Sequence, residues 1–109
     1  MGWHKISTIP ENGSKGLTIV IGEHEIRVIV VRLGDAIYCY HNACPHTGVS
    51  LDWAADQFLD TSGSLIQCAT HGALFRIEDG FCISGPCAGQ KLVPLKVNME
   101  GELFEIVAL

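Results

Sequence analysis

The 109-residue sequence predicts an all-β fold, an antiparallel β sandwich or barrel in which residues 1–109 form one domain. Two observations predict this fold. Short runs rich in Val, Ile and Leu recur along the chain, and glycine-containing turns separate them, which is a pattern of hairpins rather than of crossover helices. We therefore expect a β meander that closes on itself.

The predicted strands cover residues 17–21, 25–33, 36–41, 65–68, 74–77, 81–83, 91–97 and 103–107. Turns are predicted at residues 22–23, 34–35, 79–80 and 100–101, each of which contains a glycine. Within residues 25–33, Ile26, Val28 and Val30 share one face of the strand, whereas Glu25 and Arg27 share the other. This alternation predicts a half-buried strand.

Residues 51–60 depart from the strand pattern, because their apolar side chains are spaced for a turn or two of helix. In one interpretation Trp53 and Phe58 pin this segment to the core. In the other, Asp52, Asp56 and Asp60 form an acidic docking edge.

Composition and charge limit the function. The formal charge of −5 argues against a nucleic-acid partner and favours a basic protein partner. The N-terminus lacks the apolar stretch of a signal peptide, and the purest apolar run, residues 28–31, is far shorter than the roughly 20 residues of a membrane span. We therefore expect a cytoplasmic protein without a membrane anchor.

Two short motifs carry metal-binding residue types. They read C-x-H at Cys44 and His46, and C-x-x-H at Cys68 and His71. A loop with one thiolate and one imidazole rarely points both at the same atom, so two such loops indicate a site for two metal ions. A structural Cys2His2 zinc site is an alternative, and a Cys–His nucleophile at Cys44 or Cys68 is another.

The segments NACPHTG and CATHGALF, which contain these motifs, resemble the two cluster-binding loops of the Rieske 2Fe-2S family, and the resemblance extends over residues 36–98. It implies a Rieske-type β fold with both loops at one tip and one 2Fe-2S cluster as cofactor. Cys44 and Cys68 would bind one iron, and His46 and His71 the other. The 21 residues between His46 and Cys68 exceed the spacing usual in the family.

The same resemblance suggests how the cluster potential is set. Gly48 and Gly72 would let backbone N–H groups approach the sulfides, and Gly85-Pro86 resembles the proline loop that covers the cluster. High-potential members carry Ser and Tyr at the positions of Ala73 and Phe75, and a disulfide at those of Val49 and Thr70. Each missing hydroxyl hydrogen bond should lower the potential by ~60 to 130 mV, which predicts a low-potential centre.

The remaining cysteines and histidines have no metal motif. Cys39 is expected to be a small buried residue, whereas Cys82 and Cys87 could form a redox-active bridge or simply pack in the core. His4, His24 and His41 are expected to be ordinary surface or core residues.

The function implied by the resemblance is electron transfer. Oxygenases of the family add a catalytic domain for which 109 residues leave no room, so we expect a monomeric ferredoxin that carries electrons from a flavoprotein reductase to an oxygenase or similar acceptor. A small subunit of a larger oxidoreductase, such as a nitrite-reductase-type complex, is the alternative.

Overall fold

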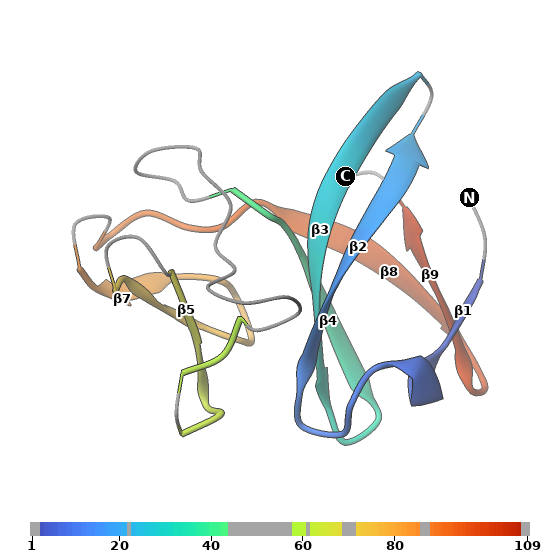
Figure 1. Ribbon diagram of the computed structural model, residues 1–109, viewed down its shortest axis with the longest axis horizontal. Helices are drawn as coiled ribbons and strands as arrows, with labels where there is room; N and C mark the ends of the chain where they lie inside the picture. The colour runs from blue at the N-terminus through green and yellow to red at the C-terminus, as the bar shows by residue number, and fades with distance from the viewer. Residues whose placement is uncertain are drawn as a thin grey trace.

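The computed structural model describes residues 3–21, 23–43, 58–60, 62–68, 72–85 and 88–107, with the Ile21 side chain left out (Figure 1). Its elements are β1 (His4–Lys5), the 3-10 helix η1 (Ile6–Thr8), β2 (Ser14–Ile21), β3 (His24–Leu33), β4 (Ala36–His41), β5 (Leu65–Gln67), β6 (Leu74–Arg76), β7 (Cys82–Ser84), β8 (Pro94–Glu100) and β9 (Leu103–Val107). The described part of the chain holds no helix with the length and apolar character needed to cross a bilayer.

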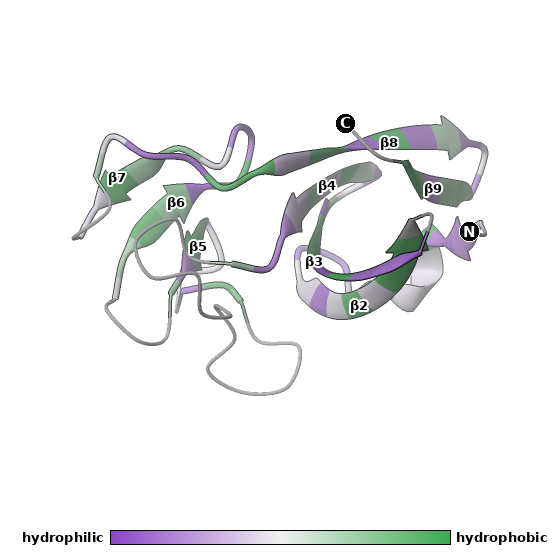
Figure 2. Ribbon diagram, turned by 90° about the horizontal axis from the view of Figure 1, so that it is seen from above, coloured by the Kyte–Doolittle hydropathy of each residue, from purple (hydrophilic) through white to green (hydrophobic). Residues whose placement is uncertain are grey.

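The strands form two antiparallel sheets. The six-stranded sheet has the order β1-β9-β8-β4-β3-β2, and the three-stranded sheet has the order β5-β6-β7. Figure 2 shows β2, β3, β4, β8 and β9 curving around a common interior, with β5, β6 and β7 set to one side. The predicted all-β fold with a curled antiparallel sheet is confirmed.

Most predicted strands are present, with shifted ends. Strands β4 and β9 have the predicted bounds, whereas β2 begins at residue 14 instead of 17, and β8 covers residues 94–100 instead of 91–97. Strand β8 extends to residue 100 because it pairs with β9 in register up to the pair Glu100 and Leu103, as a tight hairpin requires. The two-residue strand β1 and the helix η1 were not predicted.

The prediction that residues 25–33 form a half-buried strand is wrong for the second half of β3. Residues 28–31 have no exposed surface on either face. Val28 and Val30 face the interior of the six-stranded sheet, whereas Ile29 and Val31 face the three-stranded sheet. The strand is buried on both faces because it lies between two groups of core residues.

These two groups are named here the large-sheet core and the small-sheet core. The large-sheet core contains Ile6, Ile9, Val28, Val30, Cys39, Phe104 and Ile106. The small-sheet core contains Ile29, Val31, Tyr40, Phe58, Ile66, Cys68, Ala73, Phe75, Ile77, Cys82 and Leu92. The Tyr40 hydroxyl, on β4, donates a buried hydrogen bond of 2.5 Å to the Ile77 carbonyl, so a polar contact joins the two sheets as well as apolar packing.

The end of the predicted helical segment is not helical. Residues 51–57, with Trp53, Asp52 and Asp56, lie outside the described residues, and Leu59 forms a β-bridge with Ile66. The predicted anchoring by Phe58 is confirmed, since its side chain is 1% exposed and its N–H donates to Ser14 Oγ at 3.3 Å.

Asp60 has a local role in this segment. Its carboxylate accepts hydrogen bonds from the Ser62 hydroxyl at 2.7 Å and from the Ser64 N–H at 3.2 Å. The Ser62 hydroxyl is the main reason why the pKa of Asp60 lies below its ordinary value. This carboxylate therefore stabilises a turn, and its place in an acidic docking edge stays a prediction.

Candidate metal centre

Of the four predicted ligands, the structure describes Cys68. Cys44, His46 and His71 lie outside the described residues, as do Gly48, Val49 and Thr70. Cys68 follows β5 directly and has no exposed surface, and it belongs to the small-sheet core. The four-residue ligand set therefore stays a prediction.

Cys68 lies at the base of a loop that two backbone hydrogen bonds close. The Cys68 N–H donates to the Ala73 carbonyl, and the Gly72 N–H donates to the Cys68 carbonyl, each at 2.9 Å. Directly behind them, Gln67 pairs with Leu74 in the antiparallel ladder of β5 and β6. Cys68, the first residue of the second predicted motif, thus directly follows β5, and the ladder of β5 and β6 fixes its backbone.

The predicted proline loop begins in contact with this hairpin. Gly85 has a φ of +102°, and a Cβ placed on it would lie 2.7 Å from Ala73 Cα and 3.0 Å from Ala73 Cβ. A separation below 3.0 Å from a backbone atom excludes any side chain, so the two segments approach more closely than other residues allow. Pro86 and Cys87 follow outside the described residues.

The first predicted motif follows a different sheet. Asn42 and Ala43 lead out of β4, and their N–H groups donate to the carbonyls of Arg27 and His41, each at 2.9 Å. Asn42 is 6% exposed. The residues that precede Cys44 are therefore fixed to the six-stranded sheet, whereas Cys68 belongs to the three-stranded sheet.

The other described cysteines are core residues. Cys39, Cys68 and Cys82 are all buried. Cys39 lies in the large-sheet core, where burial raises its pKa to about 12, so the prediction of a small buried residue is confirmed. Cys82 is 1% exposed and its Sγ lies 3.2 Å from the Ser84 carbonyl oxygen; whether it pairs with Cys87 stays a prediction.

The described histidines take ordinary places. The His4 ring lies 5.2 Å from the Phe104 ring, and His24 is exposed at the start of β3. The His41 N–H donates to the Val93 carbonyl at 2.9 Å. No group of three or more metal-binding side chains occurs among the residues that the structure describes.

The surroundings of Cys68 fit an iron–sulfur ligand. Its thiol is enclosed with Ala73 and Phe75, both without exposed surface, and neither of these side chains has a hydroxyl. A buried cysteine that follows β5 and is shielded from water by the small-sheet core offers the thiolate donor that an iron–sulfur cluster requires.

Sequence reasoning missed two contacts that shape this region. The contact of Gly85 with Ala73 and the hydrogen bond of Tyr40 both join segments that are distant in the chain. The Gly-Pro dipeptide indicates a turn at Gly85, but the local sequence does not predict which distant residue this turn contacts.

Comparison with known proteins identifies a matching family, a relative and two structures of similar fold. The family model described as "Rieske [2Fe-2S] domain" matches residues 3–100. Ferredoxin CarAc of Metapseudomonas resinovorans is 35% identical over 79 residues, which cover 69% of this chain and 65% of that protein. The match thus spans slightly less than two thirds of this relative.

Two solved structures show the same fold. The ferredoxin of carbazole 1,9a-dioxygenase from Nocardioides aromaticivorans IC177 superposes with a TM-score of 0.76 at 19% identity, covering 100% of this chain and 97% of that one. A complex of reduced oxygenase and oxidised ferredoxin in carbazole 1,9a-dioxygenase matches with a TM-score of 0.72 at 22% identity, covering 94% and 96%. The family match, the shared fold and the buried thiol agree: this chain belongs to the Rieske [2Fe-2S] domain family, and its cofactor is a [2Fe-2S] cluster.

Proposed function

We propose that this chain is a one-electron carrier, a Rieske-type ferredoxin that accepts an electron from a flavoprotein reductase and passes it to an oxygenase or a similar acceptor. The observation that carries the proposal is the 35% identity with ferredoxin CarAc. A ferredoxin of the same fold forms a complex with an oxygenase, which supports the choice of acceptor.

The ligands that we propose are Cys44 and Cys68 for one iron and His46 and His71 for the other. The bound cluster takes up and releases a single electron. Cys68 contributes a thiolate from the fixed base of the β5–β6 hairpin, and its enclosure by the small-sheet core excludes water from that side.

The residues around Cys68 favour a low reduction potential. Ala73 and Phe75 hold the positions from which high-potential members of the family donate hydroxyl hydrogen bonds, and both side chains are fully buried here. A buried apolar group cannot stabilise the additional negative charge of a reduced site. We therefore expect a midpoint potential below zero.

We also propose that the protein is a monomer in the cytoplasm. Its charge of −5 suits a basic docking face on the partner. A permanently bound small subunit of a larger oxidoreductase would instead elute with its partner. Fractionation of the native host cells tests the location, and size-exclusion chromatography of the protein from these cells tests the monomeric state.

Two buried cysteines of the small-sheet core provide a matched test of the ligands. Cys68 and Cys82 are 0% and 1% exposed, so Ser in either place alters the core to a similar extent. After anaerobic reconstitution we expect the wild type and C82S to be red-brown and to accept one electron per two irons. C68S should lose the visible bands and the paramagnetic signal of the reduced state.

The decisive measurement is reduction of the reconstituted wild type by NADH and a flavoprotein reductase, followed by mixing with an oxidised terminal oxygenase. Recovery of the oxidised spectrum at a rate that depends on the oxygenase concentration supports the carrier function. A colourless protein that binds one zinc ion would overturn it, and so would a C68S variant that keeps its cluster.

A further inference from the structure

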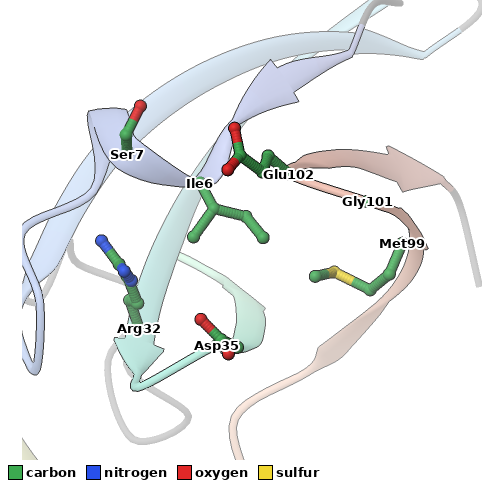
Figure 3. Close-up of a pocket in the computed structure, with 7 residues that line it drawn as sticks. All are labelled: Ile6, Ser7, Arg32, Asp35, Met99, Gly101 and Glu102. Carbon is green, nitrogen blue, oxygen red and sulfur yellow. The ribbon is translucent and has the colours of Figure 1, made fainter.

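A cavity of about 450 Å³ opens at the end of the six-stranded sheet where three turns meet (Figure 3). Its lining comes from η1, the β3–β4 turn and the β8–β9 turn. The residues that matter are Ile6, Ser7, Arg32, Asp35, Met99 and Glu102. The proposed electron-transfer function uses none of them.

One backbone hydrogen bond and two from the Arg32 side chain hold the walls of this cavity in place. The Ile6 N–H donates to the Glu102 carbonyl at 2.8 Å, which joins η1 to the β8–β9 turn. Arg32 donates from Nε to the Gly34 carbonyl at 2.7 Å and from Nη1 to the Ile9 carbonyl at 3.1 Å. Because each wall is tied to another, the cavity is formed before any ligand arrives.

The cavity combines an apolar floor with charges that are not paired. Ile6 is 7% exposed and belongs to the large-sheet core, and in Figure 3 the Met99 side chain points towards it, with Asp35 and Glu102 on opposite sides. The two carboxylates make no hydrogen bond or ion pair with any described residue. Arg32 keeps its positive charge but its donors are directed to two backbone carbonyls, so the two carboxylates give the lining a net negative charge.

We propose that this cavity binds an alkylammonium or alkylguanidinium group, with the methylene stem on Ile6 and Met99 and the cationic head between Asp35 and Glu102. Such a group is amphipathic in the way the lining requires. An anion would meet two carboxylates, and a hard divalent cation needs about six oxygen ligands, more than two carboxylates supply. The group can come from a Lys or Arg side chain of a partner protein or from a free diamine.

The position of the cavity separates it from the metal centre. Strand β8 runs from Pro94, which pairs with Tyr40 of β4, to Glu100 beside the cavity. Seven residues of strand cover about 20 Å, so the cavity lies at the opposite end of β8 from the residue that pairs with Tyr40, which belongs to the same core as Cys68. The inference therefore does not depend on which acceptor the cluster serves.

The test is a titration of the oxidised, cluster-loaded protein, labelled with ¹⁵N, with four probes. They are N-acetyl-lysine methylamide, N-acetyl-arginine methylamide, 1,4-diaminobutane and the uncharged N-acetyl-norleucine methylamide. We expect the amide signals of Ser7, Asp35 and Gly101 to shift with the cationic probes and not with the norleucine amide. Higher ionic strength should weaken the binding.

Two double variants with the same change in net charge provide the control. D35N/E102Q removes the cavity carboxylates, whereas E25Q/E105Q removes two carboxylates that do not line the cavity. We expect D35N/E102Q to bind about tenfold more weakly and E25Q/E105Q to bind like the wild type. The visible spectrum and the other amide signals report that each variant is folded.

Either of two results supports the proposal. Binding of the amino-acid amides alone identifies a Lys or Arg side chain of a partner protein as the ligand, and binding of the diamine alone identifies a free amine. Equal shifts with the norleucine amide, equal weakening in both double variants, or no shift with any probe would overturn it.

Discussion

Substitution of Gly85 by Ala tests how closely this residue, at the start of the predicted proline loop, packs against Ala73 in the β5–β6 connection. The new Cβ would lie 2.7 Å from Ala73 Cα, whereas non-bonded carbon atoms prefer about 3.5–4.0 Å. The two segments must therefore separate by about 1 Å. This overpacking costs about 1–3 kcal/mol, and a φ of +102° with a side chain costs about 1–3 kcal/mol more.

Gly89 provides the matched control for this substitution. It has a φ of +90°, but a Cβ placed on it would have no atom within 4 Å. G89A therefore carries the backbone strain without the contact. The difference in unfolding free energy between G85A and G89A isolates the contact with Ala73, and we expect G85A to be less stable by about 1–3 kcal/mol.

Two measurements check this expectation on the reconstituted protein. Urea unfolding gives the free energies, and the decay of the visible absorbance in air gives the rate of cluster loss. If the loop that begins at Gly85 shields the cluster, G85A should lose its colour faster than G89A. Equal stability and equal decay of the two variants would refute the packing argument.

Four further predictions concern single residues. Y40F leaves the buried Ile77 carbonyl without its donor and should lower the unfolding free energy in urea by about 1–3 kcal/mol, without changing the visible spectrum. Burial raises the pKa of Cys39 from 9.0 to about 12, so only the unfolded thiol ionises between these values. The free energy of unfolding should therefore fall by up to about 4 kcal/mol as the pH rises through this range. In C39A this part of the pH dependence should be absent. The pKa of Asp60 is lowered, so its pH dependence has the opposite sign. Its carboxylate stabilises the fold above the ordinary Asp pKa, and this stabilisation is lost as the pH falls through the lowered pKa. Acid unfolding of D60N should not show this loss. A73S should raise the midpoint potential in voltammetry by ~60 to 130 mV, and an unchanged midpoint would contradict the assignment of a low-potential site.

The sequence predicted the strands best where apolar and polar residues alternate next to a tight turn. Strand β9, with buried Phe104 and Ile106 between exposed or half-exposed neighbours, has the predicted bounds. Strand β1 has two residues and no pattern of its own, and it exists because His4 and Lys5 pair with β9. Long-range pairing of this kind leaves no local signal.

The error in β3 had a signal that the alternation concealed. Residues 28–31 read Val-Ile-Val-Val, and a continuous apolar run is typical of a strand buried on both faces. The charged residues Glu25 and Arg27 precede this run, in the half of the strand where one face is exposed. Reading the two halves separately would have predicted both burial patterns.

The ligand set stays a prediction from residue types and spacing, which the chemistry restricts, whereas the contacts that surround Cys68 could not be predicted. Cys68 was proposed as a ligand from its motif, and its complete burial is compatible with that role. The approach of Gly85 to Ala73 depends on how two irregular segments meet, which only the folded chain determines.

The arrangement of the two cores explains how the three-stranded sheet, in which Cys68 directly follows β5, is stable. Its strands have three residues each, too few to be stable alone. The sheet is stable because Ile29 and Val31 of β3 and Tyr40 of β4 supply part of its core. On the same two strands, Val28, Val30 and Cys39 face the other core. The six-stranded sheet thus holds the sheet of Cys68 in place, and substitutions in β3 and β4 should affect the metal centre without touching a ligand.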